Sequence, residues 1–388
     1  MPHSETSSPS PSPSSFPDLP PFPDTVPTAP LLSISYQKLL SRDREEEDRC
    51  WKACRELGFF YLDLRRSPHS SSSASVDQRV GHAGQLFDVM QRLYEEFDGM
   101  SEEGRQRFDF KDRGSYFGYK GMGKGFVDKF GTRDRNEFYN ISKDDILGLT
   151  PQLDAPELLT QHRGLCEAYI RRAHAVCKTV IQVLDQRLAL SESARRGGGL
   201  AGVHRLDAVS GDQIRFVRAP PQERAVRGVA LGEHTDFGSV TVLFNRAGGL
   251  QVRLPECISA IPAKDHGAST VEQELCKDGW TYVRPLPGHC IVNLGDALVK
   301  FSNGELRSNI HRVVAPPGEQ AKVTRYSLVY FCRPEDDVRL RSLVECGETE
   351  GECVTAKEWI LRRALGRRKV DGWEGSGGTE KESMRAGK

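Results

Sequence analysis

Two side chains that could bind a metal ion stand one residue apart in the segment GEHTDFGSVTVLF (232–244). They are His234 and Asp236, and they immediately precede a predicted strand, SVTVLF. In extended backbone, residues two apart point to the same side, so an imidazole and a carboxylate could approach one ion together. A polar turn before an ordinary buried strand explains the same tripeptide, because this motif is weak by itself.

A third ligand would have to come from a distant strand, and His311 in SNIHRVV is the best candidate by position. Taken alone, His311 is typical of a satisfied core histidine and Asp236 of a carboxylate that caps a turn. Two histidines and one carboxylate on one face form the facial triad of non-haem Fe(II) oxygenases, in which the remaining coordination positions stay open. Those open positions let the iron bind both an organic co-substrate and O₂.

Such a co-substrate needs an anchor for its far carboxylate, and Arg325-Tyr326-Ser327 follows fourteen residues after His311. Arg325 and Ser327 share one face of a strand. A guanidinium fork and a hydroxyl fit a carboxylate in a way that Lys would not. A surface arginine is the alternative, but the strand RYSLVYF is mostly apolar, and a buried Arg there would need an anion.

The elements that must position these residues are mostly helical in the first half of the chain and mostly strands in the second half. Helical spacing is found at 43–59, 81–97 and 355–368, and the longest helical pattern spans 156–190. Strands are predicted at 31–35 and 59–65, and the Gly- and aromatic-rich stretch 113–142 is predicted to be a covering loop with short extended pieces. Beyond residue 210, short strands separated by turn residues indicate an antiparallel sandwich or barrel. These are 213–219, 238–244, 250–253, 280–285, 290–295, 308–315 and 325–333.

Composition narrows the class of protein. Lys+Arg and Asp+Glu balance at 54 each among 388 residues, so no overall field favours nucleic acid or an anionic membrane. We find no transmembrane run, no signal pattern and no CxxC among the ten cysteines, and we expect a monomeric cytoplasmic protein. The Pro/Ser-rich residues 1–30 and the tail 369–388 are predicted to be disordered.

HTDFGSVTVLF, GGLQV (248–252), NLGDALVKFSNG (293–304), SNIHRVV and RYS together resemble the isopenicillin N synthase-like branch of 2-oxoglutarate/Fe(II)-dependent oxygenases. The resemblance is strongest from 210 to 335, and the leader and NIHRVVAPPGEQ are most similar to fungal members. It implies a mainly β protein with flanking helices, in which a double-stranded β-helix (jelly-roll) core rests on the long helix. The implied regions are an N-terminal oxygenase region at 31–195, the Fe(II)/2-oxoglutarate core at 196–335 and a C-terminal helical segment at 336–368.

By resemblance, His234, Asp236 and His311 are the iron ligands, and Arg325 and Ser327 hold the C5 carboxylate of 2-oxoglutarate. Many relatives carry an aromatic residue where this chain has Ala219, so that side of the pocket is predicted to be wider or lined by Arg218. Simple core packing explains each of the other predicted pocket residues equally well. Those residues are Tyr116, Phe117, Tyr119, Phe331 and Arg333.

The implied reaction uses Fe(II), 2-oxoglutarate and O₂ to oxidise a small organic molecule in fungal secondary metabolism, by hydroxylation, desaturation or ring rearrangement. An Fe(II) oxidase of the same fold that does not use 2-oxoglutarate shares the Arg-x-Ser motif and stays open. A non-catalytic binding module is a more remote alternative. A nucleic-acid substrate is disfavoured because no basic-aromatic stripe is present.

Overall fold

The computed structural model describes residues 16–65, 78–222, 228–264, 267–344, 353–366 and 368. Its strands are β1 (Ser33–Ser35), β2 (Phe59–Asp63), β3 (Gly118–Lys120), β4 (Glu137–Ser142), β5 (Gln213–Ala219), β6 (Val229–His234), β7 (Val240–Asn245), β8 (Leu250–Arg253), β9 (Trp280–Tyr282), β10 (His289–Leu294), β11 (His311–Val314) and β12 (Arg325–Cys332). Its helices are α1 (Tyr36–Leu40), α2 (Arg44–Glu56), α3 (Gln78–Asp98), α4 (Glu102–Gln106), α5 (Lys143–Ile146), α6 (Glu157–Gln161), α7 (Arg163–Arg187), α8 (Glu192–Arg196), α9 (Thr270–Leu275), α10 (Asp296–Phe301) and α11 (Ala356–Gly366).

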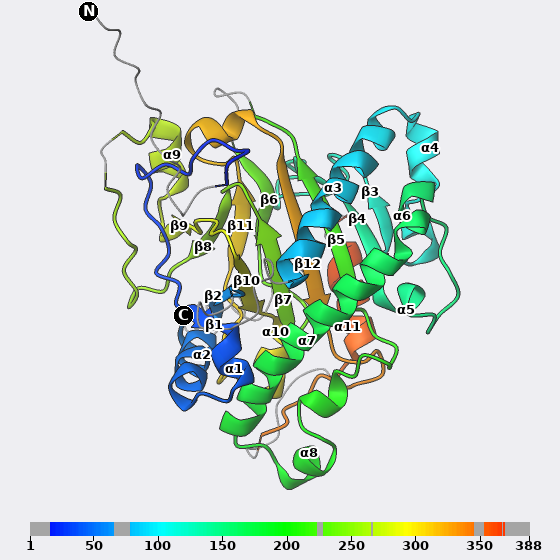
Figure 1. Ribbon diagram of the computed structural model, residues 1–388, viewed down its shortest axis with the longest axis vertical. Helices are drawn as coiled ribbons and strands as arrows, with labels where there is room; N and C mark the ends of the chain where they lie inside the picture. The colour runs from blue at the N-terminus through cyan, green and yellow to red at the C-terminus, as the bar shows by residue number, and fades with distance from the viewer. Residues whose placement is uncertain are drawn as a thin grey trace, which may run out of the picture.

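Two sheets form the core (Figure 1). The larger has the order β1-β2-β10-β7-β12-β5-β4-β3, and the smaller has the order β6-β11-β8-β9. Strand pairs are antiparallel apart from β1 and β2. Side chains of β2 and β10 in the larger sheet pack against those of β8 in the smaller sheet, so the two sheets face each other across a shared apolar layer. The predicted jelly-roll core is confirmed.

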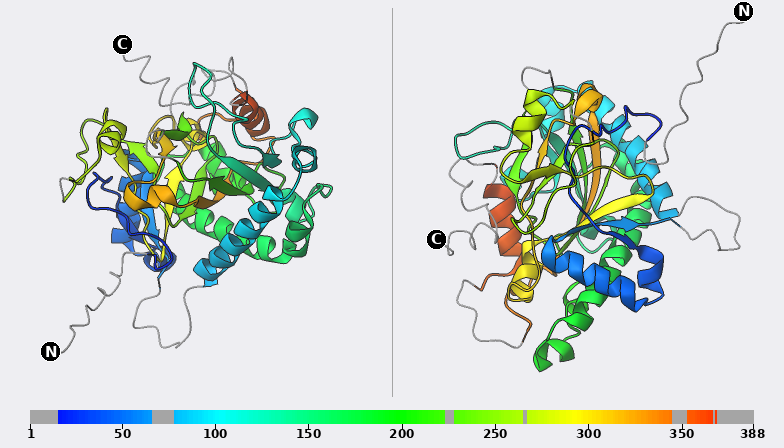
Figure 2. Two further views of the ribbon diagram at one scale, coloured as in Figure 1. Left: turned by 90° about the horizontal axis from the view of Figure 1, so that it is seen from above. Right: turned by 90° about the vertical axis from the view of Figure 1, so that its left-hand side faces the viewer.

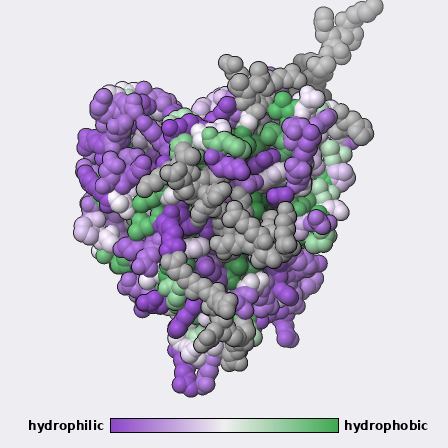
Figure 3. All heavy atoms as spheres, turned by 180° about the vertical axis from the view of Figure 1, so that it is seen from behind, coloured by the Kyte–Doolittle hydropathy of each residue, from purple (hydrophilic) through white to green (hydrophobic). Residues whose placement is uncertain are grey.

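Helices cover the larger sheet on one face. The long helix α7 buries residues at helical spacing, such as Cys166, Tyr169, Ile170, Ala173 and Cys177, and these join one core cluster with α3 and the strands. Helix α11 lies on the opposite side of the sheets from α3 and α7 (Figure 2). Seen from behind, the surface that can be described is mainly hydrophilic (Figure 3). Most apolar side chains of α3 and α7 lie instead in the buried core cluster, as their helical spacing predicted.

The segment 16–30 differs from the prediction of a disordered tail. Val26 and Ala29 are buried, and Thr28 forms isolated bridges with Tyr282 and Ile261. Asp24 forms an ion pair with Arg284. Prolines remove backbone donors but leave a stiff chain that packs well against a sheet edge, which composition alone does not reveal. The prediction is wrong for residues 16–30, whereas 1–15 and 369–388 lie outside the described residues.

Three strands near the site, β3, β4 and β6, were not predicted as such. The segment 229–234 forms β6, so the HTD tripeptide closes one strand and does not open the next one. The predicted loop 113–142 contains β3 and the six-residue strand β4, which extends the larger sheet beside β5. Its glycines hid this pairing from a prediction based on periodicity. Among the described residues, no helix is both long enough and apolar enough to cross a membrane.

Candidate active site

The two predicted histidine ligands are held side by side by strand pairing. His234 ends β6, His311 begins β11, and the two residues are direct partners in the antiparallel register. Their ring centroids are 4.2 Å apart. The Nδ1 atom of each ring hydrogen-bonds a backbone carbonyl, that of Gly232 at 2.8 Å and that of Asn309 at 3.1 Å. A proton held on Nδ1 places the lone pair of the ring on Nε2, which is the arrangement a metal ligand needs.

The carboxylate of Asp236 completes the cluster. Its Oδ2 accepts hydrogen bonds from Thr241 Oγ1 and Asn293 Nδ2, both at 2.6 Å. Its Oδ1 lies 3.9 Å from His311 Nε2. The three ligand atoms of the cluster lie within 4.8 Å of one another. Because both donors occupy Oδ2, Oδ1 is left for an ion, and the N, N, O donor set with its buried side chains fits Fe(II).

The backbone of the metal turn, residues 234–239, rests on the start of α10. The N–H groups of Asp296 and Ala297 donate to the carbonyls of Asp236 and Gly238 at 2.9 and 3.0 Å. A helix N-terminus carries N–H groups that need acceptors, and the turn supplies them. A Cβ on Gly295 would lie 2.3 Å from the Gly238 carbonyl oxygen. The NLGD segment is therefore part of the metal site's support.

Thr235, between the two ligands, faces away from them. Its Oγ1 donates to Asp296 Oδ2 at 2.9 Å and accepts from Arg363 Nη2 at 3.2 Å. Arg363 Nη1 donates to the same carboxylate oxygen at 2.7 Å, and this arginine is only 1% exposed. Helix α11 is thus bonded to the back of the metal turn, and Trp359 adds a hydrogen bond to the Phe237 carbonyl.

The predicted co-substrate anchor is a buried guanidinium that has no charged partner within the described residues. Arg325 is 2% exposed, its Nε donates to the Gly248 carbonyl at 2.7 Å, and its Nη1 donates to Ser327 Oγ at 2.6 Å. Its Nη2 is buried without an acceptor, and it forms no ion pair with a carboxylate of the described part of the chain. Burial lowers the pKa of Arg325 to about 10. An arginine in this state fits an incoming carboxylate.

A cavity opens beside His234 and Asp236. It holds about 730 Å³ of non-protein space, including solvent at its mouth. Three of the predicted pocket residues line it, namely Tyr116, Phe331 and Arg333. The structure brings these together with the metal cluster, and their role as substrate contacts stays a prediction.

The other predicted pocket residues lie elsewhere. Arg218 pairs with Asp98 and Glu137, and Tyr119 donates to Glu137 and packs edge-on against Phe97. Arg218 cannot replace the missing aromatic, because residues 218 and 219 point to opposite faces of β5. Ala219 is the register partner of Arg325 and is the residue on the anchor's side. Phe117 contacts Tyr116 but is not among the residues that line the cavity.

Several residues of the cavity were missed from the sequence. Arg215, on β5, stacks on Phe138 and Phe331. Strand parity could have found Arg215, because it lies on the same face of β5 as Ala219. The remaining missed residues come from the segment 120–140, from β6 and the turn after it, and from α11 and the residues that follow it, and no motif marked them. They are Lys120, Gly125, Phe126, Asp134, Phe138, Asn140, Leu231, Phe237, Ala364 and Arg368.

Comparison with known proteins gives the same class. The sequence profile of the 2OG-Fe(II) oxygenase superfamily matches residues 211–334. A 2-oxoglutarate-dependent dioxygenase of Aspergillus fumigatus is 30% identical over 326 residues, which cover 83% of this chain and 80% of that protein. The 2-oxoglutarate-dependent dioxygenase frbH of a Dothideomycetidae species is 29% identical and covers 87% of this chain and 90% of its own.

Solved structures share the fold. A full-length Neurospora crassa protein, crystallised in complex with alpha-KG, superposes with a TM-score of 0.62 at 22% identity, over 86% of this chain and 95% of that one. JOX2, solved with 2OG, Fe and JA, gives a TM-score of 0.58 at 22% identity over 92% and 91% of the two chains. The chain belongs to the 2OG-Fe(II) oxygenase superfamily.

Proposed function

We propose that this protein uses Fe(II), 2-oxoglutarate and O₂ to oxidise a C–H bond of a small organic molecule, in the biosynthesis of a fungal secondary metabolite. The observation that carries the co-substrate assignment is Arg325, which is buried beside Ser327 and whose Nη2 has no acceptor in the described part of the chain. The fungal sources of the relatives support the biological setting. Hydroxylation, desaturation and ring rearrangement share these residues, so the outcome depends on the substrate.

Each group of residues has one task in this function. His234, Asp236 and His311 would hold the iron, and Arg325 with Ser327 would hold the C5 carboxylate of 2-oxoglutarate. When bound, iron and 2-oxoglutarate supply the oxidising chemistry from O₂, while the protein contributes binding and orientation. The Nδ1 hydrogen bonds fix both imidazoles, and Thr241 and Asn293 fix the carboxylate. This rigidity keeps the ligand set facing one point while the cavity receives substrate.

The test is 2-oxoglutarate binding measured by calorimetry on the Fe(II)-loaded protein without oxygen, in the wild type and in Arg325→Ala. Removing one partner of a buried charge pair costs about 2–5 kcal/mol, so the dissociation constant of 2-oxoglutarate should rise at least about 30-fold. Arg246→Ala is the matched control, because Arg246 is partly exposed and pairs with Asp18. An unchanged 2-oxoglutarate affinity in Arg325→Ala would contradict the anchor.

The ratio of succinate formed to substrate consumed distinguishes the 2-oxoglutarate-dependent reaction from that of an Fe(II) oxidase. In aerobic turnover with ascorbate, against a panel of fungal polyketide, terpenoid and peptide intermediates, succinate should form in step with loss of substrate mass. Substrate loss without succinate would support an Fe(II) oxidase of the same fold. Failure of the wild type to bind Fe(II) without oxygen would instead support a non-catalytic binding module.

A further inference from the structure

The cavity beside the metal cluster combines flat apolar walls with several cations. Phe126, Phe138 and Phe331 supply aromatic surface, and Tyr116 closes one side. The cations that line the cavity are Lys120, Arg215, Arg333 and Arg368, and its carboxylates are Asp134 and the metal ligand Asp236. A cavity with this charge balance favours an anionic guest, provided that its cations are not already neutralised.

Two of the four cations are neutralised within the protein. Lys120 forms a buried ion pair with Asp134. Arg368 pairs with Asp109 at 2.8 Å. Arg215 donates to Asn140 Oδ1 at 2.7 Å and lies over the Phe138 ring. Arg215 is thus held against the wall by an amide oxygen and by the rings of Phe138 and Phe331. Arg333 is the remaining cation to consider as a ligand-binding group.

Arg333 is buried, being 4% exposed, and it forms no ion pair with a carboxylate of the described residues. Its Nη1 donates to the Gly211 carbonyl, and its guanidinium lies 5.1 Å from the Tyr116 ring and 5.4 Å from the Phe331 ring. Its Nε is buried without an acceptor among the described residues. A buried guanidinium in this state is costly unless an anion binds to it.

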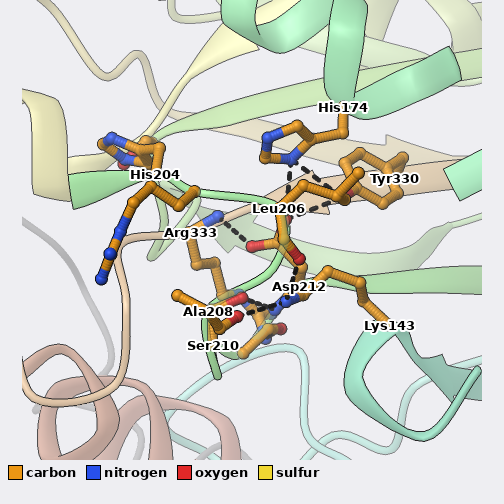
Figure 4. Close-up of polar contacts among 12 residues, drawn as sticks. Lys143, His174, His204, Leu206, Ala208, Ser210, Asp212, Tyr330 and Arg333 are labelled. Carbon is orange, nitrogen blue, oxygen red and sulfur yellow. Dashed lines mark hydrogen bonds and ion pairs between the residues drawn. The ribbon is translucent and has the colours of Figure 1, made fainter. Parts of the chain in front are cut away.

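The position of Arg333 is built by its neighbours. Asp212 Oδ1 accepts the Arg333 backbone N–H at 2.7 Å, and its Oδ2 accepts from Tyr330 at 2.7 Å, with His174 on the same oxygen (Figure 4). A Cβ on Gly238 would lie 2.7 Å from Arg333 Cγ, so only glycine leaves room for this side chain. The Asp212 carboxylate is occupied by these partners and does not pair with the guanidinium.

We propose that the substrate is a carboxylic acid with a flat apolar body, whose carboxylate binds Arg333 while its body lies between the aromatic walls beside His234 and Asp236. This assignment rests on the proposed function and names its substrate class. A planar guanidinium presents donors as a fork that matches the two oxygens of a carboxylate. The aromatic rings near Arg333 match a flat hydrophobic body.

The experiment measures binding to the full chain loaded with Fe(II) and 2-oxoglutarate without oxygen. The probes are cinnamate, 4-phenylbutanoate and 1-naphthoate, each paired with its methyl ester, and calorimetry gives their dissociation constants. Charge-assisted hydrogen bonds contribute about 1.5–3 kcal/mol, so at least one acid should bind about tenfold or more tightly than its ester. In Arg333→Met this preference should disappear, while the affinity for 2-oxoglutarate stays unchanged.

Two further variants control the result. Arg205→Met removes a guanidinium that pairs with Glu335 at the surface, and it should keep the preference for the acid. Arg333→Lys keeps the charge without the fork and should give an intermediate preference. Esters that bind as well as acids, a preference that survives in Arg333→Met, or a wild type that binds none of the acids would each overturn the substrate class. Wild-type binding of 2-oxoglutarate is measured in the same experiment, so failure of the proposed function is seen separately.

Discussion

The metal turn and the aromatic wall with Arg333 border the same cavity but are built in different ways. The proposed ligands His234, Asp236 and His311 come from two paired strands and the turn that follows one of them. The wall is assembled from β3, the loop after it, β4, β5, the end of β12 and helix α11. The ligands are tied by short hydrogen bonds to neighbouring backbone and side chains, whereas the wall is mostly ring contacts and internal ion pairs.

This difference assigns each region a task. A metal site must keep a fixed geometry, and hydrogen bonds behind every ligand supply that. A substrate wall can change its shape by single substitutions in separate segments without disturbing the ligands. The reaction class should therefore be set by the metal turn and the substrate by the wall, and variants can test each half of this statement.

The largest expected effect is at the metal turn. Asp236→Ala removes one of three ligands and leaves the donors Thr241 and Asn293 without their acceptor. Because the loss of a ligand's hydrogen-bond partner alone costs about 10- to 100-fold, the Fe(II) affinity should fall by more than about 100-fold, and succinate formation should cease. Anaerobic Fe(II) titration checks this. Asp207→Ala, at an exposed position, is the control, and an Asp236→Ala protein with wild-type Fe(II) affinity would refute the ligand assignment.

The two regions also differ in how far the sequence predicted them. His-x-Asp and Arg-x-Ser are readable because strand parity places residues two apart on one face. Along β12 and the residue directly after it, the same alternation places Arg325, Ser327, Phe331 and Arg333 on one face, and Phe331 and Arg333 line the cavity. On β5, Arg215 lies on the same face as Ala219, which pairs with Arg325, whereas the predicted Arg218 lies on the opposite face. The alternation of side chains therefore predicts which residues of one strand face the site.

Contacts between distant segments could not be read in this way. Arg368 and Phe126 reach the cavity only because α11 and the loop after β3 fold over it, and no local pattern encodes that approach. Strand β6 escaped prediction because its sequence VALGEH carries a glycine and two polar residues at its end. The packing of residues 16–30 depends on the exposed edge offered by β9, which is a tertiary feature.

The second-largest expected effect is on the free energy of unfolding, and it tests how far α11 supports the metal turn. Arg363→Met leaves the fully buried Asp296 carboxylate without its cation. Breaking a buried pair by removing one partner costs about 3–5 kcal/mol, so the free energy of unfolding should fall by that amount in chemical denaturation. Arg362→Met, at the adjacent exposed position, should change it by less than about 0.5 kcal/mol. Equal stability of the two variants would mean that α11 is not a support of the turn.

A smaller effect on Fe(II) affinity is expected at Thr241, which hydrogen-bonds the proposed iron ligand Asp236. Thr241→Val keeps the shape of the side chain but removes the hydroxyl that donates to Asp236 Oδ2. The Fe(II) affinity should fall about 10- to 100-fold, which is the usual cost of losing such a partner. Thr241→Ser retains the hydroxyl and should stay within a few-fold of the wild type. If both variants bind Fe(II) equally well, the orientation of Asp236 does not depend on this hydrogen bond.

The smallest effect tests the support behind the substrate wall, where the pKa values of two buried histidines are shifted in opposite directions. Burial disfavours the charged form of His174, but hydrogen bonds with Asp212 and Cys332 outweigh it and raise the pKa of His174 to about 10. Burial lowers the pKa of His204 below its ordinary value of 6.5. Imidazole ¹⁵N NMR at about pH 8, between these two pKa values, should therefore find His174 protonated and His204 neutral.

The raised pKa of His174 also fixes the sign of a stability change. Its ion pair with Asp212 contributes fully below pH 6.5, and that contribution is lost as the pH rises toward 10. The free energy of unfolding should decrease across this window by at least about 1 kcal/mol in the wild type, and less in His174→Gln. A wild type and a variant with the same pH dependence would show that Asp212 holds the backbone of Arg333 without help from a charged histidine, and the wall would then be supported by neutral hydrogen bonds alone.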